Sequence, residues 1–177
     1  MNLKKIIFSL LLVSSLVFAS MAITEAYTIH GYKLPSKSAT YKWGDRIING
    51  ASGSSTIKPA WEAADTSWNI ASNVIFSLNS SSVNTLSSWY EIDSNYYARA
   101  FVYPDSNAIV YKFNLDINAG NSNNYTTNVA KSSGVHEFGH ALGINHNIGV
   151  SIMNSTRNRA TIHTPQADDK AGINDIY

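Results

Sequence analysis

The chain has 177 residues, no cysteine and a formal net charge of +1, with 44% hydrophobic and 14% charged residues. A charge this close to zero, without any basic run, argues against nucleic acid or an anionic membrane as a partner. The lack of cysteine excludes a disulfide framework. In an exported protein it is more typical of a bacterial extracellular enzyme than of an animal one.

The N-terminus, residues 1–26, has the pattern of a secretory signal peptide. Two lysines precede an apolar run over residues 6–18, and small residues follow it. Cleavage after Ala22 or Ala26 fits the small-x-small rule and leaves a chain of about 150 residues, the size of one domain. The apolar run is short for a membrane span, and a retained anchor is the alternative. We therefore expect a secreted, monomeric protein with a single domain over residues 27–177.

The middle of the chain predicts a mixed order of helices and strands. Trp61 and Trp68 recur at helical spacing within residues 57–71, which predicts a helix with both rings in the core. Apolar and polar residues alternate over residues 108–118, and this period of two predicts a half-buried strand. The other expected elements are a bent strand or strand pair over residues 41–48, a Gly/Ser loop over 50–55, a strand over 74–78, and loops over 79–88 and 121–124.

One segment fills every fixed position of the pattern H-E-x-x-H-x-x-G-x-x-H. At 3.6 residues per turn, His136 and His140 project from one helix face and can bind the same ion. Glu137 leaves the helix beside His136, where it can act as a general base on a metal-activated water without binding the metal. His146 lies too far along to share that face, so the helix must end. Gly143 stands where that end requires a positive φ.

Three histidine ligands predict one catalytic zinc ion. A single histidine is more often a surface or core residue than a ligand, but the joint pattern is specific. Three neutral imidazoles leave one position of a tetrahedral zinc open for water, as in catalytic rather than structural sites. The helix that carries the first two ligands is expected to begin near Thr126 or Thr127, either of which can cap it.

The motif and the residues after it resemble the metzincin metalloendopeptidases, and within them the matrixins. Met153 stands where metzincins carry a methionine beneath the zinc, and it would pack as a core residue there. Ser155 stands where other metzincin branches have a tyrosine, which favours the matrixins. Residues 168–177 are similar to the last matrixin helix.

The resemblance implies a fold of the α/β class, of α+β type. It implies a mixed twisted sheet with a free edge strand over the cleft, an active-site helix and a C-terminal helix. Residues 96–101 are similar to that edge strand, which would bind an extended peptide by main-chain hydrogen bonds. The implied substrate-binding residues are Ala98, Arg99, Ala100 and Phe101. For Arg99 we favour the simpler interpretation of a solvated strand residue.

The predicted function is that of a secreted zinc endopeptidase acting on extended polypeptides. The alternatives are a zinc-containing binding or adhesion module without turnover, and a zinc hydrolase of a small amide. Glu137 argues against the first, because a structural site needs no base. Without a cysteine to cap the metal, the chain should need no activation beyond signal removal. A segment over residues 27–38, with His30 as a substitute ligand, is the alternative source of inhibition.

Other metal sites have less support in the sequence. The second, structural zinc site of many matrixins needs three histidines and an aspartate, but outside the motif only His30 and His163 remain. That site cannot form here. Asp105, Asp116 and Asn118 offer oxygen ligands for calcium, although acidic residues near a turn are usually only solvated.

Overall fold

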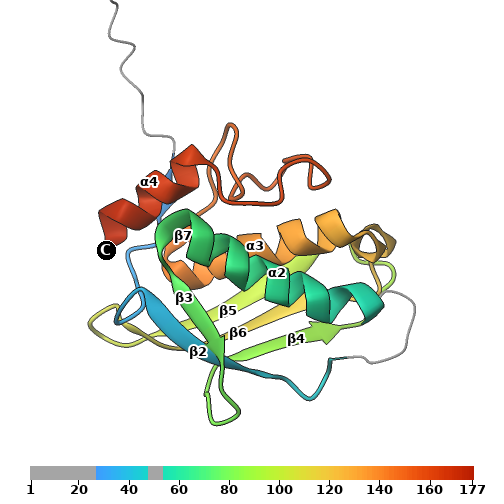
Figure 1. Cartoon of the computed structure of the whole chain (residues 1–177), viewed down its shortest axis with the longest axis horizontal. Helices are drawn as coiled ribbons and strands as arrows, with labels where there is room; N and C mark the ends of the chain where they lie inside the picture. Colours follow the sequence, from blue (N-terminus) through green and yellow to red (C-terminus); the bar gives the residue numbers. More distant parts are fainter. Residues whose placement is uncertain (1–26, 48–53) are drawn as a thin grey trace, which may run out of the picture.

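A five-stranded mixed sheet, covered on one face by two long helices, forms the centre of the computed structural model, which describes residues 27–47 and 54–177 (Figure 1). Four strands are parallel, and only the edge strand β5 is antiparallel to its neighbour β6. The expected mixed sheet with a free edge strand is thus confirmed. In sheet order the strands are β3 (Ile75–Leu78), β2 (Ser38–Trp43), β4 (Thr85–Trp89), β6 (Val110–Asn118) and β5 (Ala98–Pro104).

The expected leader and most of the expected Gly/Ser loop lie outside the described residues. Within the described ranges, no helix combines the length and the apolar character needed to cross a membrane.

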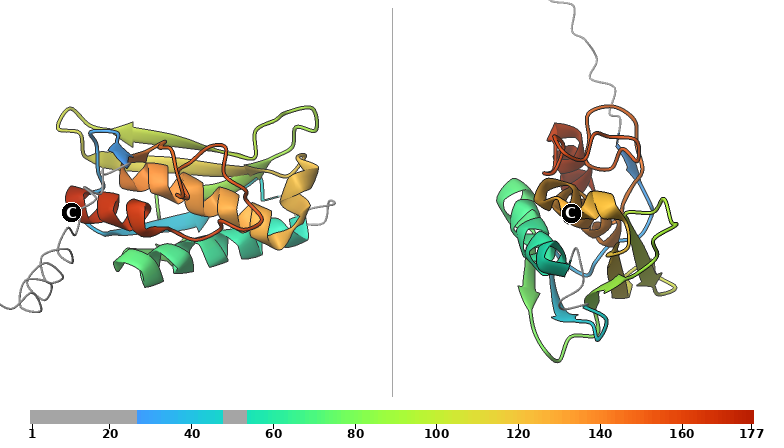
Figure 2. Two further views of the ribbon diagram at one scale, coloured as in Figure 1. Left: turned by 90° about the horizontal axis from the view of Figure 1, so that it is seen from above. Right: turned by 90° about the vertical axis from the view of Figure 1, so that its right-hand side faces the viewer.

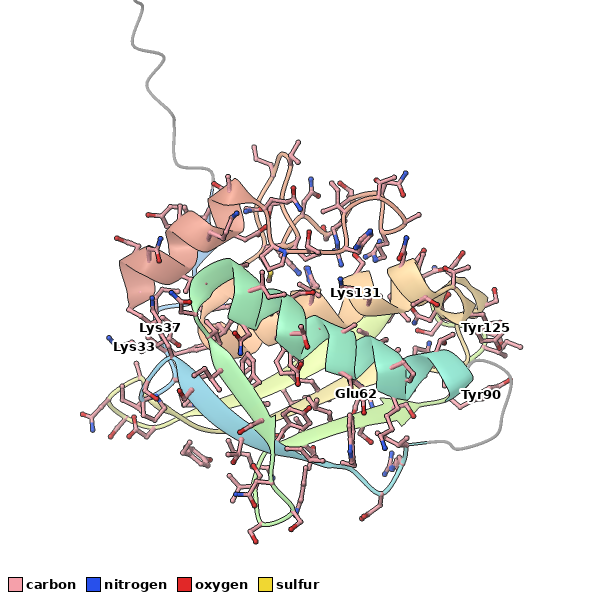
Figure 3. The ribbon with its side chains drawn as sticks, viewed as in Figure 1. Lys33, Lys37, Glu62, Tyr90, Tyr125 and Lys131 are labelled. Carbon is pink, nitrogen blue, oxygen red and sulfur yellow. The ribbon has the colours of Figure 1, made fainter. Side chains whose placement is uncertain are left out.

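The helices α2 (Ser54–Ser72) and α3 (Thr127–Leu142) lie side by side on the sheet in both views of Figure 2. The fully buried rings of Trp61 and Trp68 join them to the rest of the core, as expected. The Trp61 indole donates to the carbonyl of Ser87 in β4 at 3.0 Å, and that of Trp68 to the carbonyl of Val135 in α3 at 2.8 Å. Glu62 lies on the exposed face of α2 (Figure 3).

The helix α3 begins at Thr127, as expected, whereas the start of α2 differs from expectation. The helix α2 starts three residues earlier than predicted, so Pro59 lies inside it, where the missing N–H costs one backbone hydrogen bond. A short 3-10 turn, η1 (Ser122–Tyr125), occupies most of the loop expected before α3. Thr126 is the N-cap residue of α3, but its hydroxyl donates back to the Asn123 carbonyl at 3.1 Å and makes no capping bond.

The strand β4 begins inside the segment expected to be a loop and ends one residue beyond it. Its sequence is rich in serine, which normally favours turns, yet Ser87 and Ser88 are buried in the middle of the sheet. The Ser88 hydroxyl donates to the Arg46 carbonyl at 2.7 Å. Because the buried residues in the middle of this strand are small and polar, hydrophobic periodicity could not reveal it.

Two further strand predictions need correction. Residues 44–47 form a turn instead of the second strand expected there, with the Ile47 N–H bonded to the Gly44 carbonyl at 3.2 Å. In β6 the pairing register shifts opposite Tyr103 and Pro104, so the alternation changes phase. Tyr111 is consequently 62% exposed, although the sequence pattern places it on the core side.

The first described residues and the C-terminal helix lie together beside the last ligand segment. Strand β1 (Thr28–Ile29) pairs antiparallel with β7 (Ile144–Asn145), an arrangement that the sequence pattern did not predict. The helix α4 (Ala167–Ile176) packs nearby, and the Tyr177 hydroxyl at its end donates to the Leu142 carbonyl at 3.0 Å. These contacts hold the segment that follows α3 in place.

Candidate metal centre and substrate cleft

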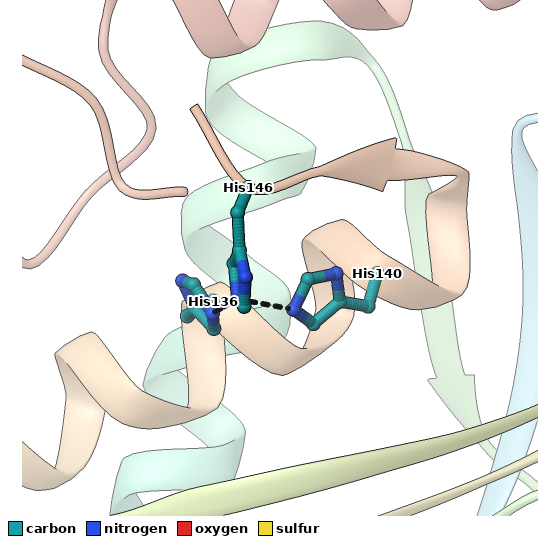
Figure 4. Close-up of side chains that lie close together, drawn as sticks. All are labelled: His136, His140 and His146. Atoms are coloured by element: carbon teal, nitrogen blue, oxygen red, sulfur yellow. Dashed lines mark hydrogen bonds between the residues drawn. The ribbon is translucent and has the colours of Figure 1, made fainter. Parts of the chain in front are cut away.

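Three histidines converge at the C-terminal end of α3 (Figure 4). His136 and His140 lie one turn apart on the helix, and His146 reaches them from the residue after β7. The Nε2 atom of His146 is 3.0 Å from that of His136 and 3.1 Å from that of His140. Ligand atoms of a tetrahedral zinc, each about 2.0–2.1 Å from the ion, are separated by about 3.4 Å. The donor set therefore fits zinc closely.

The outward nitrogens of the two helix histidines face backbone carbonyls. His136 Nδ1 lies 2.8 Å from the Ile152 oxygen, and His140 Nδ1 lies 3.1 Å from the Ile144 oxygen. A carbonyl can only accept, so Nδ1 of each ring carries the proton and Nε2 keeps its lone pair. Both rings are thus in the tautomer that binds a metal through Nε2.

Burial keeps these histidines neutral. It lowers the pKa of His136 well below its usual value, and the positive charge of Arg157 acts in the same direction. Burial, together with the neighbouring His146, lowers the pKa of His140 to about 3. The pKa of His146 is also lowered, mainly by burial. Neutral imidazole is the form that ligates zinc, so the site is ready for a metal at neutral pH.

Glu137 is buried beside the cluster, at the wall of an open cleft of about 400 Å³. Burial raises the pKa of its carboxyl to about 8, although the charges of Arg157 and Arg159 oppose the shift. A carboxyl whose pKa lies near neutrality can both accept and release a proton there. This property matches the role of proton carrier expected from the sequence.

Gly143 ends α3 in the left-handed conformation that the sequence predicts, with φ of 102°. Its own carbonyl accepts from the His30 N–H at 2.8 Å. A Cβ at this position would lie 2.3 Å from the Tyr32 carbonyl oxygen. Glycine is therefore required both by the backbone conformation and by the close approach of the N-terminal segment.

We expect Gly143→Ala to lower the free energy of unfolding by about 2–4 kcal/mol, because strain and overlap act together. Gly149→Ala is the matched control. Gly149 also has a positive φ, 93°, but a Cβ there meets nothing within 4 Å. This control should lose only about 1–2 kcal/mol. Urea denaturation of both variants measures the difference, and equal losses would contradict the importance of the Tyr32 contact.

Met153 lies directly beneath α3, as the resemblance implies. It is fully buried, and its sulfur would be 2.3 Å from a Cβ added at Gly139, the residue before His140. The fully buried carboxylate of Asp169 in α4 holds this turn. It accepts from the Ile152 and Met153 N–H groups at 2.8 and 3.3 Å, and from the Ser151 hydroxyl. A carboxylate of the last helix thus supports the floor of the site.

The edge strand β5 borders the cleft, and its residues divide between the two faces of the sheet. Ala98 and Ala100 pack toward the core on the cleft side. Arg99 pairs with Asp116 at 3.0 Å, and its guanidinium lies over the ring of Trp89, 4.2 Å from the centroid. Phe101 is 44% exposed and also contacts Arg99. The side chain of Arg99 is thus ion-paired on the sheet, which agrees with a structural strand residue.

Two arginines that sequence reasoning missed also line this cleft: Arg157 and Arg159. Arg157 is buried and donates to the Ser132 hydroxyl at 3.0 Å, the Ser132 carbonyl at 2.8 Å and the Asn154 carbonyl at 3.1 Å. Its Nη1 lies 3.2 Å from His136 Nδ1. The only sequence signal was a pair of arginines soon after Met153, which is too weak to assign a role.

The expected alternative metal ligands do not join the three converging nitrogens. His30 stacks on Tyr32, and its Nε2 is 3.2 Å from the outward Nδ1 of His140 rather than from the converging nitrogens. The calcium candidates have separate partners: Asp105 bonds its own turn, Asp116 pairs with an arginine, and the Asn118 amide donates to the Tyr96 carbonyl. Over residues 27–47 and 54–177, the three-histidine group is the one such cluster found, and calcium stays a prediction.

A helix-borne histidine pair, a third histidine after a glycine turn and an adjoining buried carboxyl define a zinc-dependent peptidase site of the metzincin type. The sequence model of the matrixin family matches residues 63–177, which include all of these groups. The chain therefore belongs to the matrixin family of zinc metalloendopeptidases. The comparison with curated proteins gives no match.

We expect His146→Ala to lower the zinc content and the thermal stability of the metal-loaded protein, because bound metal stabilises the fold in proportion to its affinity. His163→Ala removes a histidine outside the cluster and serves as the control. Zinc per chain, measured after dialysis against a weak chelator, should fall only in the His146 variant. An unchanged zinc content would exclude His146 as a ligand.

Proposed function

We propose that this matrixin is a secreted, monomeric endopeptidase that cleaves extended polypeptides, with His136, His140 and His146 as zinc ligands and Glu137 as the proton carrier. The observation that carries the proposal is the position of the buried Glu137 carboxyl, in the same open cleft as the three converging imidazoles and the free edge of β5. Zinc bound there supplies a Lewis acid that activates water and polarises the peptide carbonyl.

Groups of the protein bind the substrate, transfer the proton and orient the histidine ligands. The free N–H and C=O groups of β5 bind the substrate backbone as an added strand, which favours an extended chain over any particular sequence. The Glu137 carboxylate accepts a proton from the attacking water and passes it to the leaving amine nitrogen. Burial raises the pKa of this carboxyl above its usual value, which makes it a stronger base. The carbonyls of Ile152 and Ile144 hold the two helix imidazoles in orientation.

Export is part of the same proposal and depends on the sequence of residues 1–26. Two lysines followed by a short apolar run and small residues support cleavage after Ala22 or Ala26. N-terminal sequencing of the protein recovered from culture medium tests this. A chain that keeps residues 1–26 and stays with the membrane fraction would contradict export.

A length series of peptides separates this function from its alternatives. The substrates are unfolded casein and a series of peptides of two to ten residues. All the peptides share one central bond, and kcat/KM is measured for each substrate. We expect kcat/KM to rise at least about tenfold between two and eight residues, because binding along the strand edge contributes to the transition state. Equal rates for all lengths would indicate a small-amide hydrolase. Zinc binding without any cleavage would indicate a binding module.

A further inference from the structure

The cleft has a strongly basic wall next to Glu137. Arg157 and Arg159 come from the loop between Met153 and α4, and they face the start of β5 across the cleft. Neither guanidinium forms an ion pair within the described part of the chain, where the one ion pair between side chains joins Arg99 and Asp116. Two positive charges that form no ion pair in one cleft wall favour the binding of a negative group there.

The Arg159 guanidinium has N–H groups that lack an acceptor among the described residues. Its guanidinium lies over the ring of Tyr97, 3.9 Å from the centroid, which fixes its plane. Nη2 donates to the Ser155 carbonyl at 3.1 Å, while Nε is buried and has no hydrogen-bond partner among the described residues. A buried donor without a partner costs free energy that an incoming acceptor recovers. A planar guanidinium suits a carboxylate, which can accept two parallel hydrogen bonds from it.

Arg157 contributes charge rather than donors. Each of its three nitrogens already donates to Ser132 or Asn154, so its position is fixed. Its guanidinium lines the same cleft as that of Arg159. A carboxylate that enters the cleft would therefore lie near both positive charges.

The direction of β5 decides which part of a substrate meets this wall. The strand runs from Ala98, beside Tyr97, toward Val102, where a second hollow of about 450 Å³ borders His140 and His146. Antiparallel pairing is the more stable arrangement per residue. An antiparallel peptide places its N-terminal half near Val102 and its C-terminal half near Ala98. The residues after the cleaved bond then lie beside the two arginines.

We infer that this enzyme selects an acidic side chain, Asp or Glu, at the first positions after the cleaved bond, and that Arg159 is the specificity-determining residue. The inference rests on the proposed function, because it requires an extended peptide along β5. Charge-assisted hydrogen bonds from a guanidinium to a carboxylate are stronger than neutral ones and discriminate well against a matched amide.

Four peptides test the inference, identical except for Glu, Gln, Leu or Lys directly after the intended bond, and all amidated at the C-terminus. Amidation excludes recognition of a terminal carboxylate, and mass spectrometry of the products verifies the cleaved bond. We expect kcat/KM for the Glu peptide to be about tenfold higher than for the Gln peptide. The difference between the Glu and Lys peptides should be larger still. Rising salt should reduce the ratio.

The variants Arg159→Gln, Arg159→Lys and Arg46→Gln complete the test. Arg159→Gln should bring the Glu-to-Gln ratio close to one, whereas Arg159→Lys, which keeps the charge, should retain part of it. Arg46 is exposed in the turn after β2 and does not line the cleft with the histidines, so its variant should keep the full ratio. Equal cleavage of the Glu and Gln peptides by the wild type, or a preference for Leu, would overturn the inference alone. Failure to cleave any of them, or casein, would overturn the proposed function and this inference with it.

Discussion

Replacing Glu137 by Gln is expected to reduce kcat for peptide hydrolysis by about 10² to 10⁴, the usual contribution of a general base. Glutamine keeps the shape of the side chain but cannot accept the proton of the attacking water. Because the three imidazoles are untouched, zinc content should stay at the wild-type level. The measurement combines metal analysis with a casein assay.

Glu62→Gln is the matched control for this change. Glu62 is exposed on α2 and lies outside the cleft, so its variant removes the same charge without touching the site. Its activity should remain within about twofold of the wild type. If Glu137→Gln also kept activity within a few-fold, the carboxyl could not be the proton carrier. If it lost zinc, the lost activity would have to be assigned to the metal site instead.

A large effect on stability is expected from Asp169→Asn. Asp169 is fully buried and accepts hydrogen bonds from the N–H groups of Ile152, Met153 and Gln166, and from the Ser151 hydroxyl. In the Asn variant an NH2 group replaces one carboxylate oxygen. This group is itself a donor, so it cannot accept the hydrogen bonds that the oxygen accepted. We expect a loss of about 2–4 kcal/mol, because buried donors are left without partners. Thermal denaturation should show a Tm lower by roughly 5–15 °C.

Asp175→Asn provides the control on the same helix. Asp175 is exposed near the end of α4, so its loss should change the unfolding free energy by less than about 0.5 kcal/mol. Because Asp169 holds the turn beneath the histidines, its variant should also bind zinc more weakly. A variant as stable as the wild type would show that the Met153 turn does not depend on this carboxylate.

The metal centre could be predicted from sequence because its geometry is mostly local. The spacing of His136 and His140 is one helical turn, and Gly143 is where the helix must end. His146 then follows within a few residues, after the short strand β7. The period of two in β6 and the helical spacing of Trp61 and Trp68 were similarly informative. In each case one face of the element packs against the core and the other does not.

The features that the sequence did not reveal depend on distant contacts. Ser87 and Ser88 in β4 are buried although they are polar, and the Ser88 hydroxyl donates to the Arg46 carbonyl in the turn after β2. Arg157 and Arg159 belong to a loop without periodicity, and only the folded chain places them against β5. The pairing of β1 with β7 joins residues more than a hundred positions apart, and no local pattern encodes that pairing.

The most direct test of a zinc-dependent endopeptidase is a zinc titration of the chelator-treated protein, with bound metal and casein cleavage measured on the same samples. We predict that cleavage is lost with the metal and returns in proportion to bound zinc, reaching its full rate at one ion per chain. Cleavage that continues after the metal is removed, or zinc that returns without cleavage, would contradict the account.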